Sequence, residues 1–557
     1  MVRIEGRQIV AETLTCRAVF ENGWLVELGR PGGPSYLSGV DTSRSALTLL
    51  YPGQGTTDVM GNLAATVSLH ALSPLSAQFR ISGWDGDGIV TVSEDPETGD
   101  VLVEPSGYSS RPGLLSVRWR VDGMREGLNL VAPFFQGTRL PLGDPLLARR
   151  WFWPHFWEAG LAILESEDGR GGFWVHCRDR AYRYKALNIE GRELGFETEA
   201  YGPIDSSLGA GGLVWRINVF DGDWRQPAAV YRDWLWAAYG LAEQEGLRCA
   251  WHQDIRFAVS WYGGDPELLD ALAEQLDPRS VLLHYSQWRT DGYDENYPTY
   301  TPSEQAKAVI AKANAMGFHI MPHANSVDMD PSHPAYAYLR EFEYRDVSTR
   351  RRLGWGWDQA AGGVLGVPNS SHNLADNRAR KVMVKIHPGL AMWRSILCEE
   401  IQKALVQAPN DAIFIDVTLC SHNLHQCLVE NTTSSEGMDR LIRQIQSLGG
   451  GLTVGGEGIN EITMQGLSFA QAHLFNSWHA SADGLARAGG AALGDFLWGK
   501  LCRAFGYSNL SGATPESEMR MSVHEQLGAI PTVTVGNAEA IRRPNAAVAR
   551  ALEQAKS

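Results

Sequence analysis

Two carboxylates at the ends of apolar segments are the residues best suited to chemistry. Asp416 ends the run AIFID, and Glu457 ends the run GLTVGGE; both runs have the composition of buried strands. A buried carboxylate must be paired, hydrogen-bonded or used, because an unpaired buried charge costs several kcal/mol. Neighbouring parallel strands lie ~4.8 Å apart, so carboxylates at matching heights come within about 5–6 Å. This separation suits retaining glycoside hydrolysis, in which one carboxylate attacks the anomeric carbon and the other protonates the leaving oxygen.

Other interpretations of the two carboxylates stay open. Asp416 could cap a helix or pair with Arg440, and Glu457 could pair with a lysine or an arginine. Glu461 is a rival acid four residues after Glu457, although its position also suits the first turn of a following helix. Asp483 is a third carboxylate that could serve as the acid/base.

Polar and aromatic residues follow several of the predicted strands. The active site of a parallel barrel lies at the carboxyl ends of its strands. A neutral sugar needs directional hydrogen bonds and one or two stacking faces. We therefore predict substrate contacts from Trp261, Trp288, Asp294, His323, Asn325, His422, His479 and Asp483.

The sequence predicts neither a metal nor a cofactor. His422 and His425 stand near Asp416, but they lack the helical HExxH pattern of a zinc site. No GxGxxG follows a first strand, and no GxxxxGK[ST] occurs, which argues against nucleotide binding.

The scaffold for these residues is a strand–helix alternation that begins at about Trp251. A large insertion, about Asp328 to Asn377, separates the third and fourth strands and contains Trp355 and Trp357. Alternation of this kind predicts a (β/α)8 (TIM) barrel over about residues 250–557. The strands are expected at Ile255–Trp261, Val281–Gln287, His319–His323, Ala412–Val417, Gly451–Glu457, Phe469–Phe475 and Pro531–Val535. The helices are expected at Pro266–Gln275, Thr301–Met316, Pro388–Val406 and Ser435–Leu448.

The first 245 residues contain strand-like runs without helices between them. One such run is Ala18–Glu27, which we interpret as a single strand. Many short strands separated by turn residues predict an antiparallel β-sandwich over residues 1–245. Gln226–Leu241 has helical periodicity and is expected to be a helix that links the sandwich to the barrel. The predicted chain is therefore multidomain, with a β domain followed by an α/β domain.

Composition excludes several classes of protein. The chain has 557 residues, 44% of them hydrophobic, which excludes a largely disordered protein. Its 49 basic and 64 acidic residues give a net charge of −15, so we expect neither nucleic acid nor a membrane as partner. The N-terminal residues have no apolar signal region, and we expect a cytoplasmic protein. Seven cysteines without a CxxC pair argue against a disulfide framework, and a homo-oligomer is compatible with the sequence.

Five segments, in order, resemble the barrel motifs of bacterial retaining α-glycosidases. They are HYSQWRTDGYDENYPTYTP, HANSVDMDP, HPGLAMWR, IFIDVT and GGEG, within about residues 251–480. The likeness is to glycosidase-like proteins near the endo-α-N-acetylgalactosaminidases and, more distantly, to the α-galactosidase and α-glucosidase superfamily. The resemblance implies a β-sandwich before the barrel, Asp416 as nucleophile and Glu457 as acid/base. No second Asp of the α-galactosidase type stands in a matching motif.

We therefore expect a glycoside hydrolase that cleaves terminal α-linked sugars by double displacement, with a glycoside or oligosaccharide as substrate. The alternative is a non-catalytic carbohydrate-binding protein on the same scaffold. A binding protein needs no close carboxylate pair, so Asp416 and Glu457 favour the enzyme. The sequence does not indicate which sugar is bound.

Overall fold

The computed structural model describes most of the chain, which divides into two compact units. The first unit contains Met1–Phe134 and Thr138–Trp234, and the second contains Phe135–Gly137 and the described residues from Leu235 to Ser557. The described residues are 1–51, 55–58, 66–83, 86–202, 206–293, 295–343, 353–356, 372–373, 382–420, 428–474, 490–506 and 515–557.

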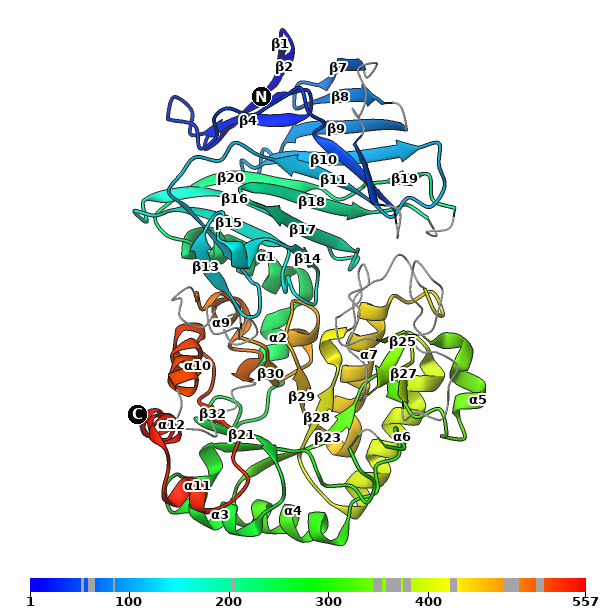
Figure 1. Ribbon diagram of the computed structural model, residues 1–557, viewed down its shortest axis with the longest axis vertical. Coiled ribbons are helices and arrows are strands. Elements are labelled where there is room, and N and C mark those ends of the chain that lie inside the picture. The colour runs from blue at the N-terminus through cyan, green and yellow to red at the C-terminus, as the bar shows by residue number, and fades with distance from the viewer. Residues whose placement is uncertain are drawn as a thin grey trace. The chain divides into compact units, whose positions relative to one another are not determined.

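The first unit is made of antiparallel sheets (Figure 1). One sheet has the order β13 (Thr138–Pro141), β12 (Leu128–Ala132), β15 (Leu161–Ser166), β16 (Gly171–Cys177), β20 (Trp215–Asp221), β10 (Val101–Ser109), β9 (Gly86–Glu94), β8 (Ser76–Ser82) and β7 (Thr66–Ser73), and β19 (Gly209–Ala210) pairs with β10. A second has the order β14 (Arg150–Phe152), β17 (Lys185–Glu190), β18 (Glu193–Glu199), β11 (Ser116–Val121), β5 (Leu47–Tyr51) and β6 (Gly55–Asp58). A smaller sheet contains β1 (Val2–Glu5), β2 (Gln8–Glu12), β3 (Arg17–Glu21) and β4 (Trp24–Gly29).

The two larger sheets bury their facing sides against each other. Phe196 of β18 and Trp215 of β20 contact with ring centroids 5.0 Å apart. Strand β9 shows the expected alternation, since Val90 and Val92 are buried and Thr91 between them is more exposed. The predicted antiparallel β-sandwich is confirmed.

The segment Ala18–Glu27 is a hairpin, so the prediction of a single strand was wrong. Strand β3 ends at Glu21 and β4 begins at Trp24. Asn22 and Gly23 between them have φ values of 50° and 87°. Positive φ at both central residues is the type I′ turn, for which Asn-Gly is the preferred pair. The apolar residues on both sides concealed this turn.

The second unit contains a parallel sheet that curves into a barrel. Its described strands have the order β31 (Arg503–Gly506), β30 (Phe469–Ala472), β29 (Thr453–Glu457), β28 (Ala412–Asp416), β23 (His319–Asn325), β22 (Val281–Tyr285), β21 (Phe257–Tyr262) and β32 (Thr532–Val533). Phe505 of β31 forms a parallel bridge with Ile530, just before β32, and brings the sheet nearly to closure. The predicted barrel is confirmed, although β31 was not predicted.

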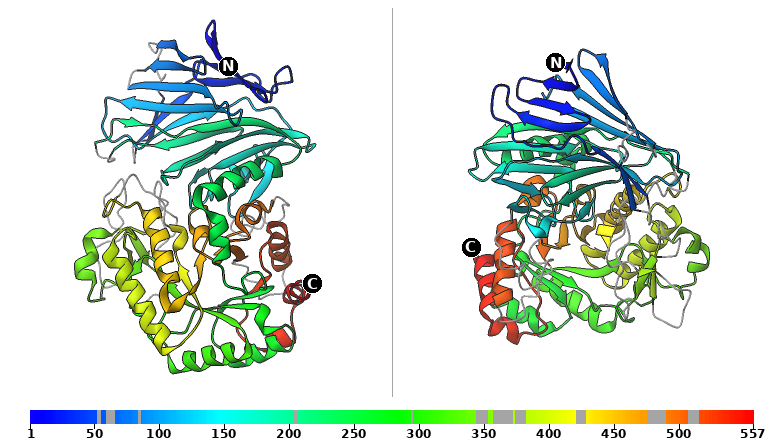
Figure 2. Two further views of the ribbon diagram at one scale, coloured as in Figure 1. Left: turned by 180° about the vertical axis from the view of Figure 1, so that it is seen from behind. Right: turned by 45° about the horizontal axis from the view of Figure 1, so that its top comes forward.

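Helices alternate with these strands and lie around them (Figure 2). Side-chain caps start four of those described: Asp265 caps α3, Ser303 caps α4, Asn545 caps α12, and Thr433 forms a capping box with Glu436 in α7. The α-helices among the described residues are α1 (Arg225–Tyr239), α2 (Leu241–Gly246), α3 (Pro266–Ala273), α4 (Glu304–Met316), α5 (Tyr336–Leu339), α6 (Ala391–Gln407), α7 (Ser434–Gln446), α9 (Leu493–Trp498), α10 (Pro515–Leu527), α11 (Glu539–Arg542) and α12 (Ala546–Lys556). Within the described residues, none of the helices is both long and apolar enough to cross a membrane.

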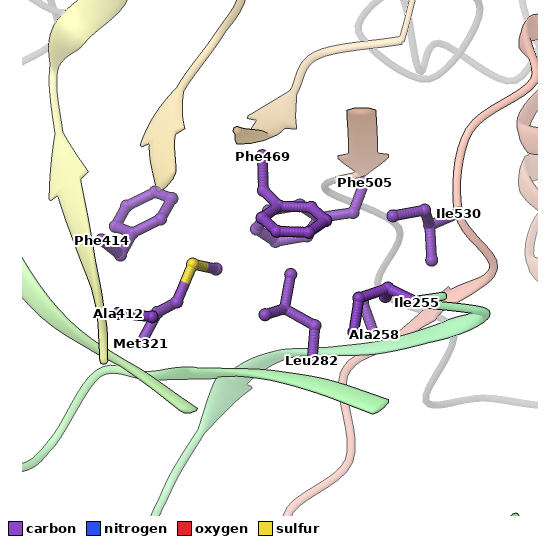
Figure 3. Close-up of a cluster of buried hydrophobic side chains, with 9 residues drawn as sticks. All are labelled: Ile255, Ala258, Leu282, Met321, Ala412, Phe414, Phe469, Phe505 and Ile530. Carbon is purple, nitrogen blue, oxygen red and sulfur yellow. The ribbon is translucent and has the colours of Figure 1, made fainter. Parts of the chain in front are cut away.

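The interior of the barrel is filled by apolar side chains from successive strands (Figure 3). These residues are at most 2% exposed, as expected for a packed barrel core. They are Ile255, Ala258, Leu282, Met321, Ala412, Phe414, Phe469, Phe505 and Ile530.

The insertion between β23 and β28 contains a small antiparallel sheet. Its strands have the order β24 (Asp328–Met329), β27 (Val382–Lys385), β25 (Leu353–Gly356) and β26 (His372–Asn373). A buried ion pair joins two of them, because Lys385 Nζ lies 3.0 Å from Asp328 Oδ1. Trp355 lies in β25, and Trp357 is outside the described residues.

Candidate active site

The candidate carboxylates lie directly after the apolar interior of the barrel. Side chains two positions apart on a strand point to the same side. Phe414 belongs to the core, so Asp416 follows it on the inner side of β28. The position of a Cβ at Gly455 faces Met321 and Phe414, so Glu457 follows on the inner side of β29.

Asp416 and Glu457 stand at matching heights on neighbouring strands. Ile415 pairs with Gly456 in the parallel register, and the two carboxylates are the next residues. The backbone N–H of Val417 donates to Oε2 of Glu457 at 3.1 Å. The main chain beside the first carboxylate therefore holds the second.

Asp416 is 7% exposed and is surrounded by polar groups. Its Oδ2 accepts a hydrogen bond from the Tyr293 hydroxyl at 3.3 Å and lies 3.5 Å from Nε2 of His323. The backbone oxygen of Asp416 accepts hydrogen bonds from Ser326 N–H and Oγ, at 3.1 and 2.6 Å. Within the described residues, Arg440 does not pair with Asp416. Its guanidinium group donates a hydrogen bond to the Thr432 hydroxyl at 2.9 Å.

Glu457 is anchored but keeps part of its side chain, 16%, exposed. Its Oε1 lies 3.7 Å from Nε2 of His473. The His473 ring contacts Phe135 edge-on, with centroids 6.2 Å apart. Thr418 Oγ1 donates to the backbone oxygen of Glu457 at 2.6 Å and ties the ends of β28 and β29 together. This carboxylate can therefore keep its orientation while it meets a substrate.

Two residues with unfavourable backbone angles border this site. Trp261 has φ of 58° and Val417 has φ of 63°. A β-branched residue such as valine is a genuine outlier in this region. Strain of this kind costs about 1–3 kcal/mol and clusters at functional sites. In this site, the backbone conformation of Val417 directs its N–H toward the Glu457 carboxylate.

The structure brings two of the predicted substrate-binding residues to Asp416. His323 is 1% exposed and approaches Asp416 directly. Burial and the neighbouring His284 lower the pKa of His323 well below its ordinary value. Trp261 is partly exposed, and its ring lies 5.6 Å from the ring of Tyr293 and 5.8 Å from that of His323.

Two other predicted residues use their polar groups within the protein. Trp288 is 2% exposed, and its indole N–H donates to the backbone oxygen of His323 at 2.7 Å. Asn325 is 1% exposed; its amide donates to Asp328 Oδ2 at 3.1 Å and accepts from Asp328 N–H at 2.8 Å. These contacts fix the chain where it leaves β23.

Four predicted substrate contacts lie outside the described residues, and their roles stay predictions. They are Asp294, His422, His479 and Asp483. The rival Glu461 is 2% exposed and lies in a turn before the short helix Thr463–Gln465. Within the described ranges, no three His, Cys, Asp or Glu side chains are grouped in a way that could hold a metal ion.

Four polar residues of this region are not among the predicted substrate contacts. His284 follows Leu282 on the inner side of β22, and Gln471 and then His473 follow Phe469 at two-residue intervals. Period-two alternation from the core residues could have found these three. Tyr293 follows β22 in a loop, where no periodicity applies.

Comparisons with known proteins extend the description of the fold. The model of a domain of unknown function, DUF6259, matches residues 214–440. No curated protein matches the sequence.

Solved structures similar to this chain include the α-N-acetylgalactosaminidase NagBb from Bifidobacterium bifidum. Its Gal-NHAc-DNJ complex has a TM-score of 0.69 and 14% identity, over 100% of this chain and 92% of that chain. Its GalNAc complex has a TM-score of 0.67, with the same identity and coverage. The α-galactosidase AgaB from Geobacillus stearothermophilus has a TM-score of 0.47 and 11% identity, over 100% of this chain and 86% of that chain. The chain thus has the fold of NagBb, and the resemblance to sandwich-and-barrel α-glycosidases is confirmed at the level of the fold.

Proposed function

We propose that this protein is a retaining glycoside hydrolase that removes terminal α-linked sugars. The observation that carries the proposal is the pair Asp416 and Glu457, at matching heights on neighbouring barrel strands and joined through the Val417 N–H. The pair supports the proposal because glycosidases cleave the glycosidic bond with two carboxylates, and the active site of a barrel lies at the carboxyl ends of its strands. The fold shared with an α-N-acetylgalactosaminidase is consistent with it.

In the first step Asp416 attacks the anomeric carbon and forms a covalent glycosyl-enzyme. The bond to the leaving oxygen breaks as Glu457 gives that oxygen a proton. Tyr293, which donates to Asp416 Oδ2, and His323 at 3.5 Å from the same atom keep the carboxylate oriented for attack.

In the second step Glu457 takes a proton from water, and the water oxygen replaces Asp416 at the anomeric carbon. Two inversions give a product of retained configuration. The contacts of Glu457 to Val417 N–H and His473 leave its carboxylate in one position for both proton transfers. Such a mechanism needs the two carboxyl groups ~5–5.5 Å apart.

The substrate is a glycoside or oligosaccharide with an α-linked terminal sugar. The partly exposed Trp261 offers a stacking face beside Asp416. A substrate panel should include the α-N-acetylgalactosaminide, since NagBb is named for that activity. It should also include α-galactosides, α-glucosides and the matching β-glycosides as nitrophenyl derivatives.

The test uses Asp416→Ala and Glu457→Ala, with Asp411→Ala as a matched control. Asp411 precedes the other end of β28, and its side chain is 56% exposed. Asp416→Ala should lower kcat by about three orders of magnitude or more. Glu457→Ala should spare the first step with nitrophenolate leaving groups, and added azide should yield a glycosyl azide of retained configuration. Asp411→Ala should keep the wild-type kcat.

Three outcomes would count against the proposal. A product of inverted configuration by NMR would refute the double displacement. An inverted azide adduct from Glu457→Ala would make Glu457 the nucleophile. Sugar binding by calorimetry without turnover of any glycoside in the panel would favour a non-catalytic carbohydrate-binding protein.

A further inference from the structure

Two buried histidines, His284 and His323, form a series of contacts that reaches Asp416. The Trp261 backbone N–H donates to Nδ1 of His284 at 3.4 Å. Nε2 of His284 lies 2.9 Å from Nδ1 of His323, a hydrogen-bond distance. Nε2 of His323 lies 3.5 Å from Oδ2 of Asp416. The four groups form one continuous series of contacts that ends on the proposed nucleophile.

The backbone amide at the start of this series determines the direction of every bond in it. An amide N–H can only donate, so Nδ1 of His284 is the acceptor and carries no proton. A neutral His284 then carries its proton on Nε2 and donates it to Nδ1 of His323. A neutral His323 in turn carries its proton on Nε2, the atom that faces Asp416.

The surroundings keep both rings neutral. Neither side chain is more than 1% exposed, and the Phe414 ring lies 4.1 Å from the His284 ring. Burial lowers the pKa of His284 to about 3, and it lowers the pKa of His323 well below the ordinary value. The positive charge of Arg289 also disfavours a cationic His323.

We propose that His284 and His323 form a neutral relay, from the Trp261 amide to Asp416, that fixes the orientation of this carboxylate. Both histidines are positioning residues, and their effect on turnover rests on the proposed function. The Nε2 of His323 makes no hydrogen bond with the described residues. We expect its 3.5 Å contact with Asp416 Oδ2 to shorten when substrate binds, because hydrogen bonds of active sites are often long without substrate.

The relay has a spectroscopic test that does not need activity. Long-range ¹H–¹⁵N spectra of the full chain with ¹⁵N-labelled histidine, at pH 7, report which ring nitrogen carries the proton. His284→Phe and His323→Phe assign the signals, with Gln as the replacement where a Phe variant does not fold. Both rings should be protonated on Nε2 alone, and Asp416→Asn should move the Nε2 signal of His323 more than that of His284. A proton on Nδ1 of either ring, or an unmoved His323 signal, would overturn the relay.

Steady-state kinetics tests what the relay does for the nucleophile. His284→Phe should lower kcat by about tenfold to a hundredfold with little change in KM, as expected for a displaced reacting group. His323→Gln, which keeps an N–H donor, should retain more activity than His323→Phe. His252→Phe is the matched control, because His252 is buried in the same unit and bonds to Ser468 O instead. Equal kcat for His284→Phe and His252→Phe would refute the positioning role. If wild-type protein turns over no glycoside, the proposed function fails, and the NMR result alone decides the relay.

Discussion

Acid should destabilise the barrel unit through its buried histidines. Burial lowers the pKa of His252 and of His524 to about 4, and that of His284 to about 3. Histidines of the unfolded chain have pKa values near 6.5. Below this pH the unfolded state therefore binds protons that the folded state does not, so stability present above pH 6.5 is lost as the pH falls.

The size of the effect follows from the difference between the two pKa values. Each such histidine lowers the free energy of unfolding by about 2 kcal/mol at pH 5.0 relative to pH 7.5. The reason is that pH 5.0 lies about 1.5 units below the pKa of a histidine in the unfolded chain, and each unit contributes about 1.4 kcal/mol. The three rings together cost about 6 kcal/mol, which is comparable to the free energy of unfolding of a typical domain. His323, whose pKa is also lowered by burial, acts in the same direction. Asp439 and Asp495 act in the opposite direction, because burial raises the pKa of both carboxyl groups.

A single variant isolates one histidine from this sum. Urea unfolding of wild type and His252→Phe, followed by tryptophan fluorescence at pH 7.5 and 5.0, gives the acid-induced loss for each. The loss should be smaller by about 2 kcal/mol in His252→Phe. Phe469→Leu is the control for a change in packing at this place. The ring of Phe469 lies 5.0 Å from that of His252 and has no titratable group. An equal acid-induced loss in wild type and His252→Phe would refute the reasoning.

Two further substitutions test the site and the sandwich. Tyr293→Phe removes the hydroxyl that donates to Asp416 and should lower kcat about tenfold with KM little changed, measured on a nitrophenyl glycoside; an unchanged kcat would contradict the role of this hydrogen bond. Glu197 is fully buried with its oxygens 2.6 Å from Arg118 and from Arg150, so Glu197→Ala leaves two partly buried arginines without this partner and should cost about 3–5 kcal/mol. Thermal unfolding should show the loss, whereas Glu274→Ala, which breaks an exposed pair with Arg542, should change Tm little.

Apolar periodicity was enough to predict most strands of the barrel. Strands β28 and β29 follow from continuous apolar runs that end in a carboxylate. Strand β31 was missed because Arg503–Gly506 is four residues long and contains no β-branched residue. The Asn22–Gly23 hairpin was missed because apolar residues on both sides outweighed a turn signal two residues long.

The candidate site could be predicted only in part, because its contacts depend on pairs of residues far apart in sequence. The strand-end position of Asp416 indicates a site without any tertiary information. The contact of Tyr293 with Asp416 joins residues 123 positions apart and depends on a loop path that no periodicity encodes. The side-chain amide of Asn325 is suited to hydrogen-bond a sugar hydroxyl. In the structure, however, this amide donates a local hydrogen bond to Asp328.

The same burial that makes the barrel sensitive to acid serves the proposed nucleophile. A cationic His323 at 3.5 Å would form an ion pair with Asp416. This ion pair would make the carboxylate a weaker nucleophile toward the sugar. A neutral His323 offers one N–H, which orients the carboxylate and leaves its charge in place. Burial, which lowers the pKa of His323, favours this neutral form beside the proposed nucleophile at neutral pH. His284 then contributes by keeping the proton of His323 on the nitrogen that faces Asp416.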